Sequence, residues 1–225
     1  MAGDPDNWRL YVITDSRLSD RGHLEIARAA IAGGAEVIQF REKAMSTGEM
    51  HDICMALREM TAEADVDFIV NDRLDLALAV DADGVHLGQD DLPLDAAREI
   101  LGPEKLIGGS AKNLVEAKHV EAAGADYVGV GPVFEARHTK PDTIEPQGVK
   151  LISQVISEVS MPVVAIGGIN RANVRSVIQA GARVVSVISD IVTADDMQSA
   201  TSELRRLIVD ETDRLHGQSA QKTRG

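Results

Sequence analysis

The sequence FIVNDRLDLALAVDADGVHLGQDD, residues 68–91, decides how the rest of the chain is interpreted. Two short apolar runs, Phe68–Val70 and Gly84–Leu87, predict buried strands, and the apolar spacing between them predicts a short helix. Acidic and amide side chains follow each predicted strand. Parallel strands joined by a crossover helix end at the same edge of a sheet, so we expect these polar side chains to lie together.

Short apolar strands followed by helical periodicity continue along the whole chain. Strand and helix alternate about eight times, at the repeat of roughly 30 residues that a (β/α)8 barrel needs. Glycine closes a helix and a β-branched strand follows at once in residues 33–37, 122–128 and 180–184. We therefore predict an α/β fold, a single (β/α)8 TIM barrel over residues 1–215, with a polar, disordered tail over 216–225. The alternative is an open doubly wound sheet, which the lack of an early G-x-G-x-x-G motif disfavours.

Composition and charge argue against several classes of protein. The 225 residues include 36 acidic and 23 basic ones, and the formal net charge of −13 disfavours binding to nucleic acid or to a membrane surface. No apolar run reaches the ~18 residues of a membrane span, and the first residues do not have the pattern of a secretory signal. Cys54 is the single cysteine, which fits a reducing cytosol, and its helical spacing places it in the core. We predict a cytoplasmic protein and leave homo-oligomerisation open.

The last two predicted strands indicate a phosphate site. In a barrel the active site lies at the carboxyl ends of the strands, and the loops after strands seven and eight commonly bind phosphate through backbone N–H groups. Gly167 and Gly168 follow the seventh strand, and Ile188 and Ser189 end the eighth. The alternative is a plain glycine turn needed for packing. We expect one monophosphate to bind here.

Two cations after the second strand indicate a second anion site. Arg41 and Lys43 alternate along the strand exit, so both can face the barrel mouth while Glu42 turns away. Arginine offers a bidentate fork and lysine a point charge, a combination suited to a diphosphate. The alternative is a solvated surface run. Lys140, on the long loop after the sixth strand, could close over the same charge.

Carboxylates after the third and fourth strands indicate a metal site. Asp72 and Asp91 suit Mg2+, which is usually held by one or two carboxylates together with substrate phosphates and water. The spacing at the strand edge allows Asp90 in place of Asp91, and the alternative role for each aspartate is a helix cap. His86 lies within the fourth strand and is expected to be a packed core histidine rather than a ligand.

One monophosphate and one Mg2+-bound diphosphate imply a transfer between two phosphorylated small molecules. Since the strand ends show neither a nucleophile nor a strong base, a dissociative displacement fits best. The departing diphosphate would be stabilised by Mg2+, Arg41, Lys43 and Lys140.

These residues carry a resemblance to the thiamine-phosphate synthase family. The segments appear in the family's order and cover nearly the whole chain: QFREK (39–43), VNDRLDLAL (70–78), GVHLGQDD (84–91), GGSAKN (108–113), ADYVGVGPVF (125–134), TKPD (139–142), IGGI (166–169) and VIS (187–189). The resemblance implies a (β/α)8 transferase that joins hydroxymethylpyrimidine diphosphate to a thiazole phosphate, with or without a carboxylate on the thiazole, and releases diphosphate.

The resemblance also implies a role for each matching residue. Asp72 and Asp91 would bind Mg2+, which decides between Asp90 and Asp91 by analogy. The residues implied for the pyrimidine diphosphate are Gln39, Arg41, Lys43, Asn71, Ser110 and Lys140. The residues implied for the thiazole phosphate are Thr139, Gly168, Ile188 and Ser189.

Two other functions compete with this interpretation. A related thiazole tautomerase would have no need of the diphosphate cluster, so the intact set of cations and carboxylates argues against it. A non-catalytic sensor of thiamine phosphate would be expected to carry a partner-binding or DNA-binding segment, and none is appended. Release of diphosphate from the two substrates with Mg2+ separates the three functions.

The loop before Lys140 departs from the family pattern of two threonines around one residue before the lysine. Residues 134–140 keep only the second threonine, Thr139, and are one residue longer. We hypothesise that Arg137 or His138 supplies the replacement donor to the thiazole phosphate. Replacing both by alanine should therefore raise the KM for the thiazole phosphate in steady-state kinetics and leave the KM for the pyrimidine diphosphate unchanged. An unchanged KM for the thiazole phosphate would dismiss the hypothesis.

Overall fold

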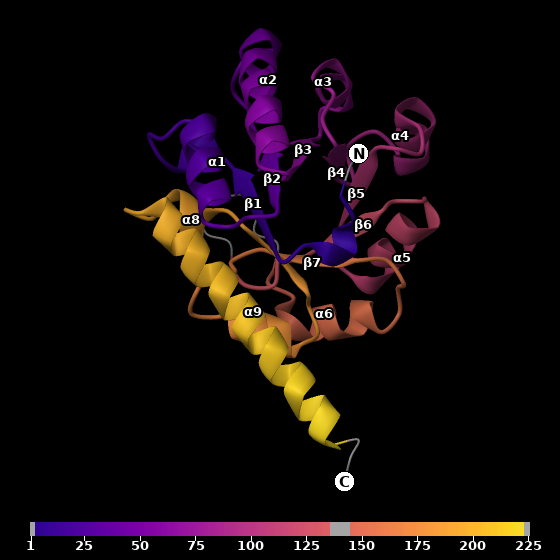
Figure 1. Cartoon of the computed structure of the whole chain (residues 1–225). Coiled ribbons are helices and arrows are strands. Elements are labelled where there is room, and N and C mark those ends of the chain that lie inside the picture. Colours follow the sequence, from indigo (N-terminus) through magenta and orange to yellow (C-terminus); the bar gives the residue numbers. More distant parts are fainter. Residues whose placement is uncertain (1–2, 136–144, 223–225) are drawn as a thin grey trace.

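Eight parallel strands close into a barrel in their sequence order (Figure 1). The computed structural model describes residues 3–135 and 145–222, with side chains as far as 218. The strands are β1 (Leu10–Thr14), β2 (Val37–Phe40), β3 (Asp67–Asn71), β4 (Gly84–Leu87), β5 (Leu106–Ala111), β6 (Tyr127–Val130), β7 (Val163–Ile166) and β8 (Val184–Val187). Since β8 pairs with β1, the (β/α)8 prediction is confirmed and the open sheet is wrong.

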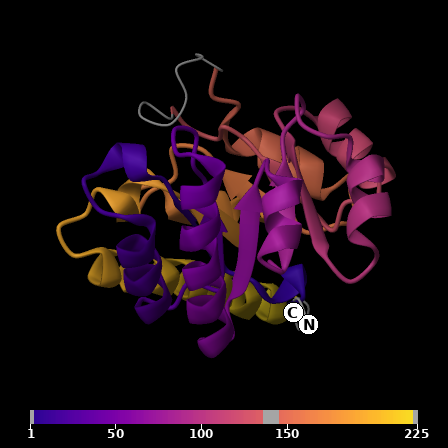
Figure 2. The same cartoon turned by 90° about the horizontal axis from the view of Figure 1, so that it is seen from above.

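Helices surround the barrel and bury its outer face (Figures 1 and 2). They are α1 (His23–Ala32), α2 (Thr47–Glu63), α3 (Leu74–Ala79), α4 (Leu94–Leu101), α5 (Leu114–Ala122), α6 (Gly148–Ile156), α7 (Val174–Gln179), α8 (Ser189–Val192) and α9 (Met197–Lys222), with short 3-10 turns η1 (Pro5–Asn7) and η2 (Ser16–Leu18). Ser46 is the N-cap of α2 and forms a reciprocal capping box with Glu49. Within the described residues, no helix is long and apolar enough to cross a membrane.

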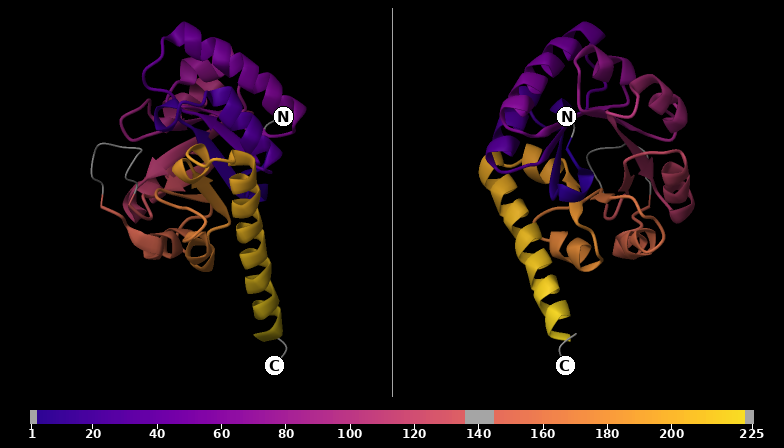
Figure 3. Two further views of the ribbon diagram at one scale, coloured as in Figure 1. Left: turned by 90° about the vertical axis from the view of Figure 1, so that its left-hand side faces the viewer. Right: turned by 45° about the vertical axis from the view of Figure 1, so that its right-hand side comes forward.

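The C-terminal region differs from its prediction. Helix α9 runs to Lys222, so residues 216–222 are helical and not the predicted disordered tail. Leu215 packs against the core near the end of the predicted domain, and Glu211 pairs with Arg214 one turn away. Once these contacts hold the helix, each further residue adds a hydrogen bond without a new nucleation cost. The end of α9 therefore extends beyond the barrel (Figure 3).

Aromatic side chains fill the inside of the barrel. Tyr11 and Tyr127 meet through their hydroxyls at 2.9 Å, and Trp8 packs edge-on against both rings at the amino end. The indole N–H of Trp8 donates to Asp67 at 2.7 Å, which satisfies its polar atom. Gly108 leaves room for this cluster, because a Cβ there would lie 2.1 Å from Cζ of Tyr127. The interior is thus a packed core and holds the strands at fixed positions.

Cys54 lies on the inner side of α2 and is fully buried, as predicted. Burial raises the pKa of its thiol to about 12. The thiol is therefore an uncharged part of the apolar core.

Replacing Gly108 by alanine should destabilise the barrel by about 1–3 kcal/mol, because the new methyl group overlaps the Tyr127 ring. The matched control is Gly48→Ala in the first turn of α2, where nothing lies within 4 Å of an added Cβ. That control should be neutral or stabilising by up to ~1 kcal/mol. Thermal unfolding followed by circular dichroism compares the two variants. Equal melting temperatures for both would contradict the tight packing of Tyr127.

Candidate active site

The carboxyl ends of the strands bring most of the predicted site residues to one end of the barrel. Those within the described residues are Gln39, Arg41, Lys43, Asn71, Asp72, Asp91, Ser110, Gly168, Ile188 and Ser189. Thr139 and Lys140 lie outside the described residues, as do Arg137 and His138.

Asp72 and Asp91 face each other after β3 and β4. The backbone N–H of Asp72 donates to the carbonyl of His86 at 2.9 Å, which continues the β3–β4 pairing by one residue. Asp72 then adopts φ +62°, a left-handed conformation that an Asp tolerates better than most residues. An oxygen of Asp91 accepts from the N–H of Gly88 at 2.6 Å, and its carboxyl group contacts that of Asp72.

The two carboxylates repel each other, because they carry like charges at close range. Burial raises the pKa of Asp91, and the contact with Asp72 and its negative charge raise it further. The hydrogen bond from Gly88 and the charge of Lys43 act in the opposite direction and are outweighed. A cation placed between the two carboxylates would remove this repulsion.

The structure also tests the alternatives for these acidic residues. Asp90 is exposed and Asp91 is half-buried beside Asp72, so Asp91 is the one that forms the pair. Helix α3 begins after Arg73 and α4 after Pro93, and neither helix has a side-chain cap. The helix-cap alternative is therefore wrong for Asp72 and Asp91.

Two carboxylate groups on one rim suit Mg2+, which prefers oxygen ligands and commonly takes only one or two carboxylates from the protein. Among residues 3–135 and 145–222, no group of three or more His, Cys, Asp or Glu side chains could hold a metal. The arrangement therefore fits an ion that completes its coordination with substrate oxygens and water. It does not fit a closed structural metal site.

Arg41 and Lys43 each contact a carboxylate at the same rim. Arg41 pairs with Asp15, and Lys43 pairs with Asp72. The Asp15 side chain is 1% exposed and also receives two hydrogen bonds from the Arg17 guanidinium, at 3.0 and 2.8 Å. Burial alone would raise the pKa of Asp15, but hydrogen bonds from Arg17 and the charges of Arg41 and Arg17 hold it below its usual range. Asp15 is thus a fixed anion that orients Arg41.

Glu42 turns away from the mouth, as alternation predicts, but it is not a solvated residue. Its side chain is 1% exposed and accepts four hydrogen bonds, from Ser16, His23 and the backbone N–H groups of Lys43 and Ala44. Burial opposes its ionisation, yet these donors lower the pKa of Glu42 to about 2. Ser16 and His23 come from the β1–α1 region, so the sequence around Glu42 does not reveal these two partners.

A chain of polar side chains, buried on one side of the barrel and half-buried on the other, crosses the interior beneath the rim. Gln39 donates to Tyr11 at 2.8 Å, the two tyrosines share a contact of 2.9 Å, and His86 lies 3.2 Å from Tyr127 and 2.9 Å from Ser110. His86 is a half-buried, hydrogen-bonded residue of the barrel interior, and not the fully packed core histidine that was predicted. The chain joins Gln39 and Ser110, which the resemblance assigns to the same substrate. The two tyrosines were not foreseen, although their inward positions in apolar strands are a usable signal.

The ends of β7 and β8 form the other part of the rim. Gly167 and Gly168 have φ values of +99° and +65°, and a Cβ at Gly168 would lie 2.6 Å from the carbonyl oxygen of Glu135. Glycine is thus required by the backbone at both positions. Ile188 precedes the short helix α8, and its side chain is partly buried against the barrel interior. A phosphate role for this turn stays a prediction.

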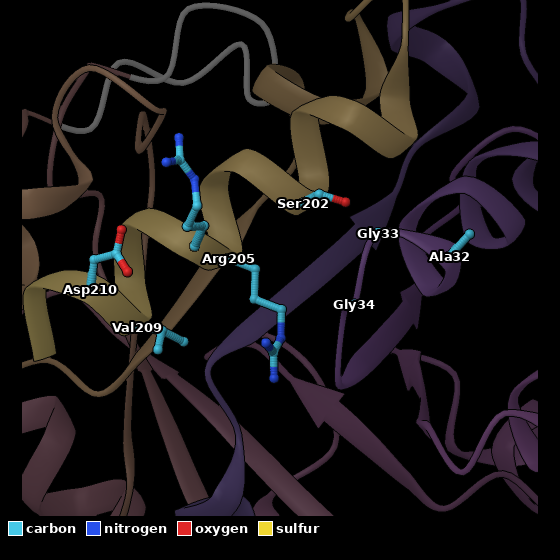
Figure 4. Close-up of a pocket in the computed structure, with 8 residues that line it drawn as sticks. Ala32, Gly33, Gly34, Ser202, Arg205, Val209 and Asp210 are labelled. Carbon is cyan, nitrogen blue, oxygen red and sulfur yellow. The ribbon is translucent and has the colours of Figure 1, made fainter. Parts of the chain in front are cut away.

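Two surface hollows lie away from this rim. One, of about 370 Å³, lies between α9 and the turn from α1 to β2 and includes Gly33, Gly34 and Arg205 (Figure 4). The other, of about 380 Å³, is at the amino end of the barrel beside Trp8 and Asp67. Neither contains a predicted site residue.

Comparison with known proteins gives one consistent result. The family model "Thiamine monophosphate synthase" matches residues 10–191. A thiamine-phosphate synthase of Chloroflexus aurantiacus is 52% identical over 90% of this chain and 93% of its own, and one of Moorella thermoacetica is 48% identical over 89% and 96%. A solved structure of thiamine phosphate pyrophosphorylase from Pyrococcus furiosus superposes with a TM-score of 0.85 at 43% identity, covering 92% of this chain and 98% of that one. The chain belongs to the thiamine monophosphate synthase family.

Proposed function

We propose that this chain is a thiamine-phosphate synthase. It condenses 4-amino-2-methyl-5-hydroxymethylpyrimidine diphosphate with 4-methyl-5-(2-phosphoethyl)thiazole, or its carboxylate, to give thiamine phosphate and diphosphate. The observation that carries the proposal is the contact between Asp72 and Asp91 beside Arg41 and Lys43 on one rim of the barrel. A cytoplasmic location is part of the proposal and agrees with the single buried cysteine.

The diphosphate end of the pyrimidine substrate would bind at this rim. When bound, Mg2+ supplies positive charge that stabilises the departing diphosphate. Asp72 and Asp91 would hold it, with Arg41 as a fork and Lys43 as a point charge on the phosphate oxygens. Lys140 would add a third cation from the loop after β6. These groups stabilise negative charge on the leaving group, which lowers the barrier to breaking the carbon–oxygen bond.

The pyrimidine ring would lie above the polar chain that crosses the barrel. The Gln39 amide donates one N–H to Tyr11, which fixes its orientation, and its carbonyl oxygen would accept from the substrate. Asn71 and Ser110 come from β3 and β5 on the same side of the interior. Fixed dipoles around the ring would favour the transient positive charge that develops as the diphosphate leaves.

The thiazole phosphate would bind across the mouth. Gly168 has no side chain in the way of an anion, and the backbone N–H groups around Ile188 and Ser189, together with Thr139, would join it in binding the phosphate. The thiazole nitrogen then attacks the carbon that carried the diphosphate. The displacement is dissociative: the carbon–oxygen bond breaks first, its electron pair leaves with the diphosphate, and one new carbon–nitrogen bond then forms.

The two competing functions are less well supported. A tautomerase would not need two cations and two carboxylates on one rim, and the relatives at 42–52% identity are named as synthases. This chain matches 93% and 96% of the length of two relatives that are named as synthases, and none of these names describes a sensor.

Replacing Asp72 or Asp91 by asparagine should lower the rate of diphosphate release by about 100-fold or more, since metal-ion stabilisation is worth several kcal/mol. Asparagine keeps the size of the side chain and tolerates the left-handed conformation at residue 72. Coupled release of diphosphate is measured with both substrates and Mg2+. Asp90→Asn is the matched control, because Asp90 is exposed beside Asp91, and it should change the rate by less than about twofold. The affinity for thiazole phosphate should stay close to that of the unaltered protein in all three variants, and equal losses in D90N and D91N would refute the metal assignment.

The raised pKa of Asp91 predicts how activity depends on pH. A proton on Asp91 competes with Mg2+. At limiting Mg2+ the rate should therefore begin to fall at a higher pH than it would with an aspartate of ordinary pKa. Saturating Mg2+ should shift this acid limb to lower pH, because the metal favours the ionised carboxylate. Rate profiles at two Mg2+ concentrations test the point. An acid limb that does not move with Mg2+ would speak against it.

A further inference from the structure

The loop that carries Arg41 and Lys43 is fixed by a carboxylate that faces away from the substrate. One oxygen of Glu42 accepts from the backbone N–H groups of Lys43 at 2.6 Å and Ala44 at 2.7 Å. Its other oxygen accepts from the hydroxyl of Ser16 at 2.6 Å and from Nε2 of His23 at 3.1 Å. The carboxylate therefore ties the turn after β2 to the start of the α1 segment.

This network is part of the protein interior. The side chains of His23 and Glu42 are 0% and 1% exposed. Nδ1 of His23 lies 2.7 Å from the hydroxyl of Thr14, and that hydroxyl also lies 3.2 Å from the carbonyl oxygen of Gln39. A buried carboxylate is costly unless its oxygens are satisfied, and here each oxygen has two donors. With four donors around it, the carboxylate is held in one position and so is the turn that donates to it.

We infer that Glu42 is a positioning residue for the diphosphate: it holds the backbone of residues 42–44 so that Arg41 and Lys43 point into the barrel mouth. The inference rests on the proposed function. Glu42 does not touch the substrate and acts only through the turn it fixes. The geometry of the turn, rather than the negative charge of Glu42, is what the site requires, since a negative charge beside a diphosphate would itself be unfavourable.

Two conservative substitutions separate geometry from charge. Glu42→Gln removes the charge but keeps an acceptor for the two backbone N–H groups. The amide nitrogen of Gln at position 42 can donate to the hydroxyl of Ser16. It can also donate to Nε2 of His23 if the ring proton of His23 moves to Nδ1. Nδ1 can then donate to the hydroxyl of Thr14, which still donates to the carbonyl of Gln39. Glu42→Asp keeps the charge, but the side chain is one methylene shorter and cannot reach both sets of donors.

The experiment measures the KM values of both substrates and, by calorimetry with Mg2+, the Kd of inorganic diphosphate. Glu42→Asp should raise the KM for the pyrimidine diphosphate and the Kd for diphosphate about tenfold or more, because a small displacement of the cations is costly. Glu42→Gln should keep both within about threefold, and both variants should keep the KM for thiazole phosphate. Glu49→Asp is the control, because Glu49 is exposed in the adjacent capping box and loses the same methylene.

The outcomes distinguish the inference from the function on which it rests. If the affinity for diphosphate falls in Glu42→Gln and is kept in Glu42→Asp, the inference is overturned, because the site then requires the negative charge of Glu42 and not the geometry of the turn. Equal changes in the KM of both substrates, or the same loss in Glu49→Asp, would overturn it in favour of general destabilisation. An unaltered protein that neither releases nor binds diphosphate would refute the proposed function itself, and the inference with it.

Discussion

The hydrogen bond from the backbone of Asp72 to the carbonyl of His86, 2.9 Å long, is the contact on which the arrangement of the site depends. It carries the pairing of β3 and β4 past the end of β3 and turns Asp72 toward Asp91. Closed barrel pairing brings β2 alongside β3, so that Lys43 reaches the same carboxylate. Parallel pairing around a closed barrel thus sets the distances between residues far apart in sequence.

Polar groups below the rim are organised by the same constraint. Inward positions on β1, β2, β4, β5 and β6 form one hydrogen-bonded chain from Gln39 to Ser110. Such a chain stabilises the interior only when its members are satisfied, because an unpaired polar group is costly in a low-dielectric core. Within the described residues, Ser186 Oγ is the buried side-chain atom that has no hydrogen-bond partner. The chain gives the substrate-facing residues fixed orientations before a ligand arrives.

The sequence predicted the barrel and the rim well, because strand periodicity and strand ends are local signals. It could not separate Asp90 from Asp91 without analogy, since that choice depends on the turn at Gly88. It treated Glu42 as an outward residue, because the donors on Ser16 and His23 come from an earlier segment. It ended the last helix too early, since a polar composition does not reveal that Leu215 anchors the helix. Local sequence patterns therefore predict the strands and helices, whereas the side-chain contacts at the site depend on how segments far apart in the chain pack together.

The buried thiol of Cys54 has a practical consequence. Thiol reagents attack the thiolate, and a fully buried group with a pKa of about 12 presents almost none at neutral pH. A cysteine introduced on the surface would therefore be the reactive one, so the natural sequence is already a background for attaching a single fluorophore or spin label. A probe placed on an exposed position of α2 or α3 could report ligand arrival at the rim without removal of the native residue.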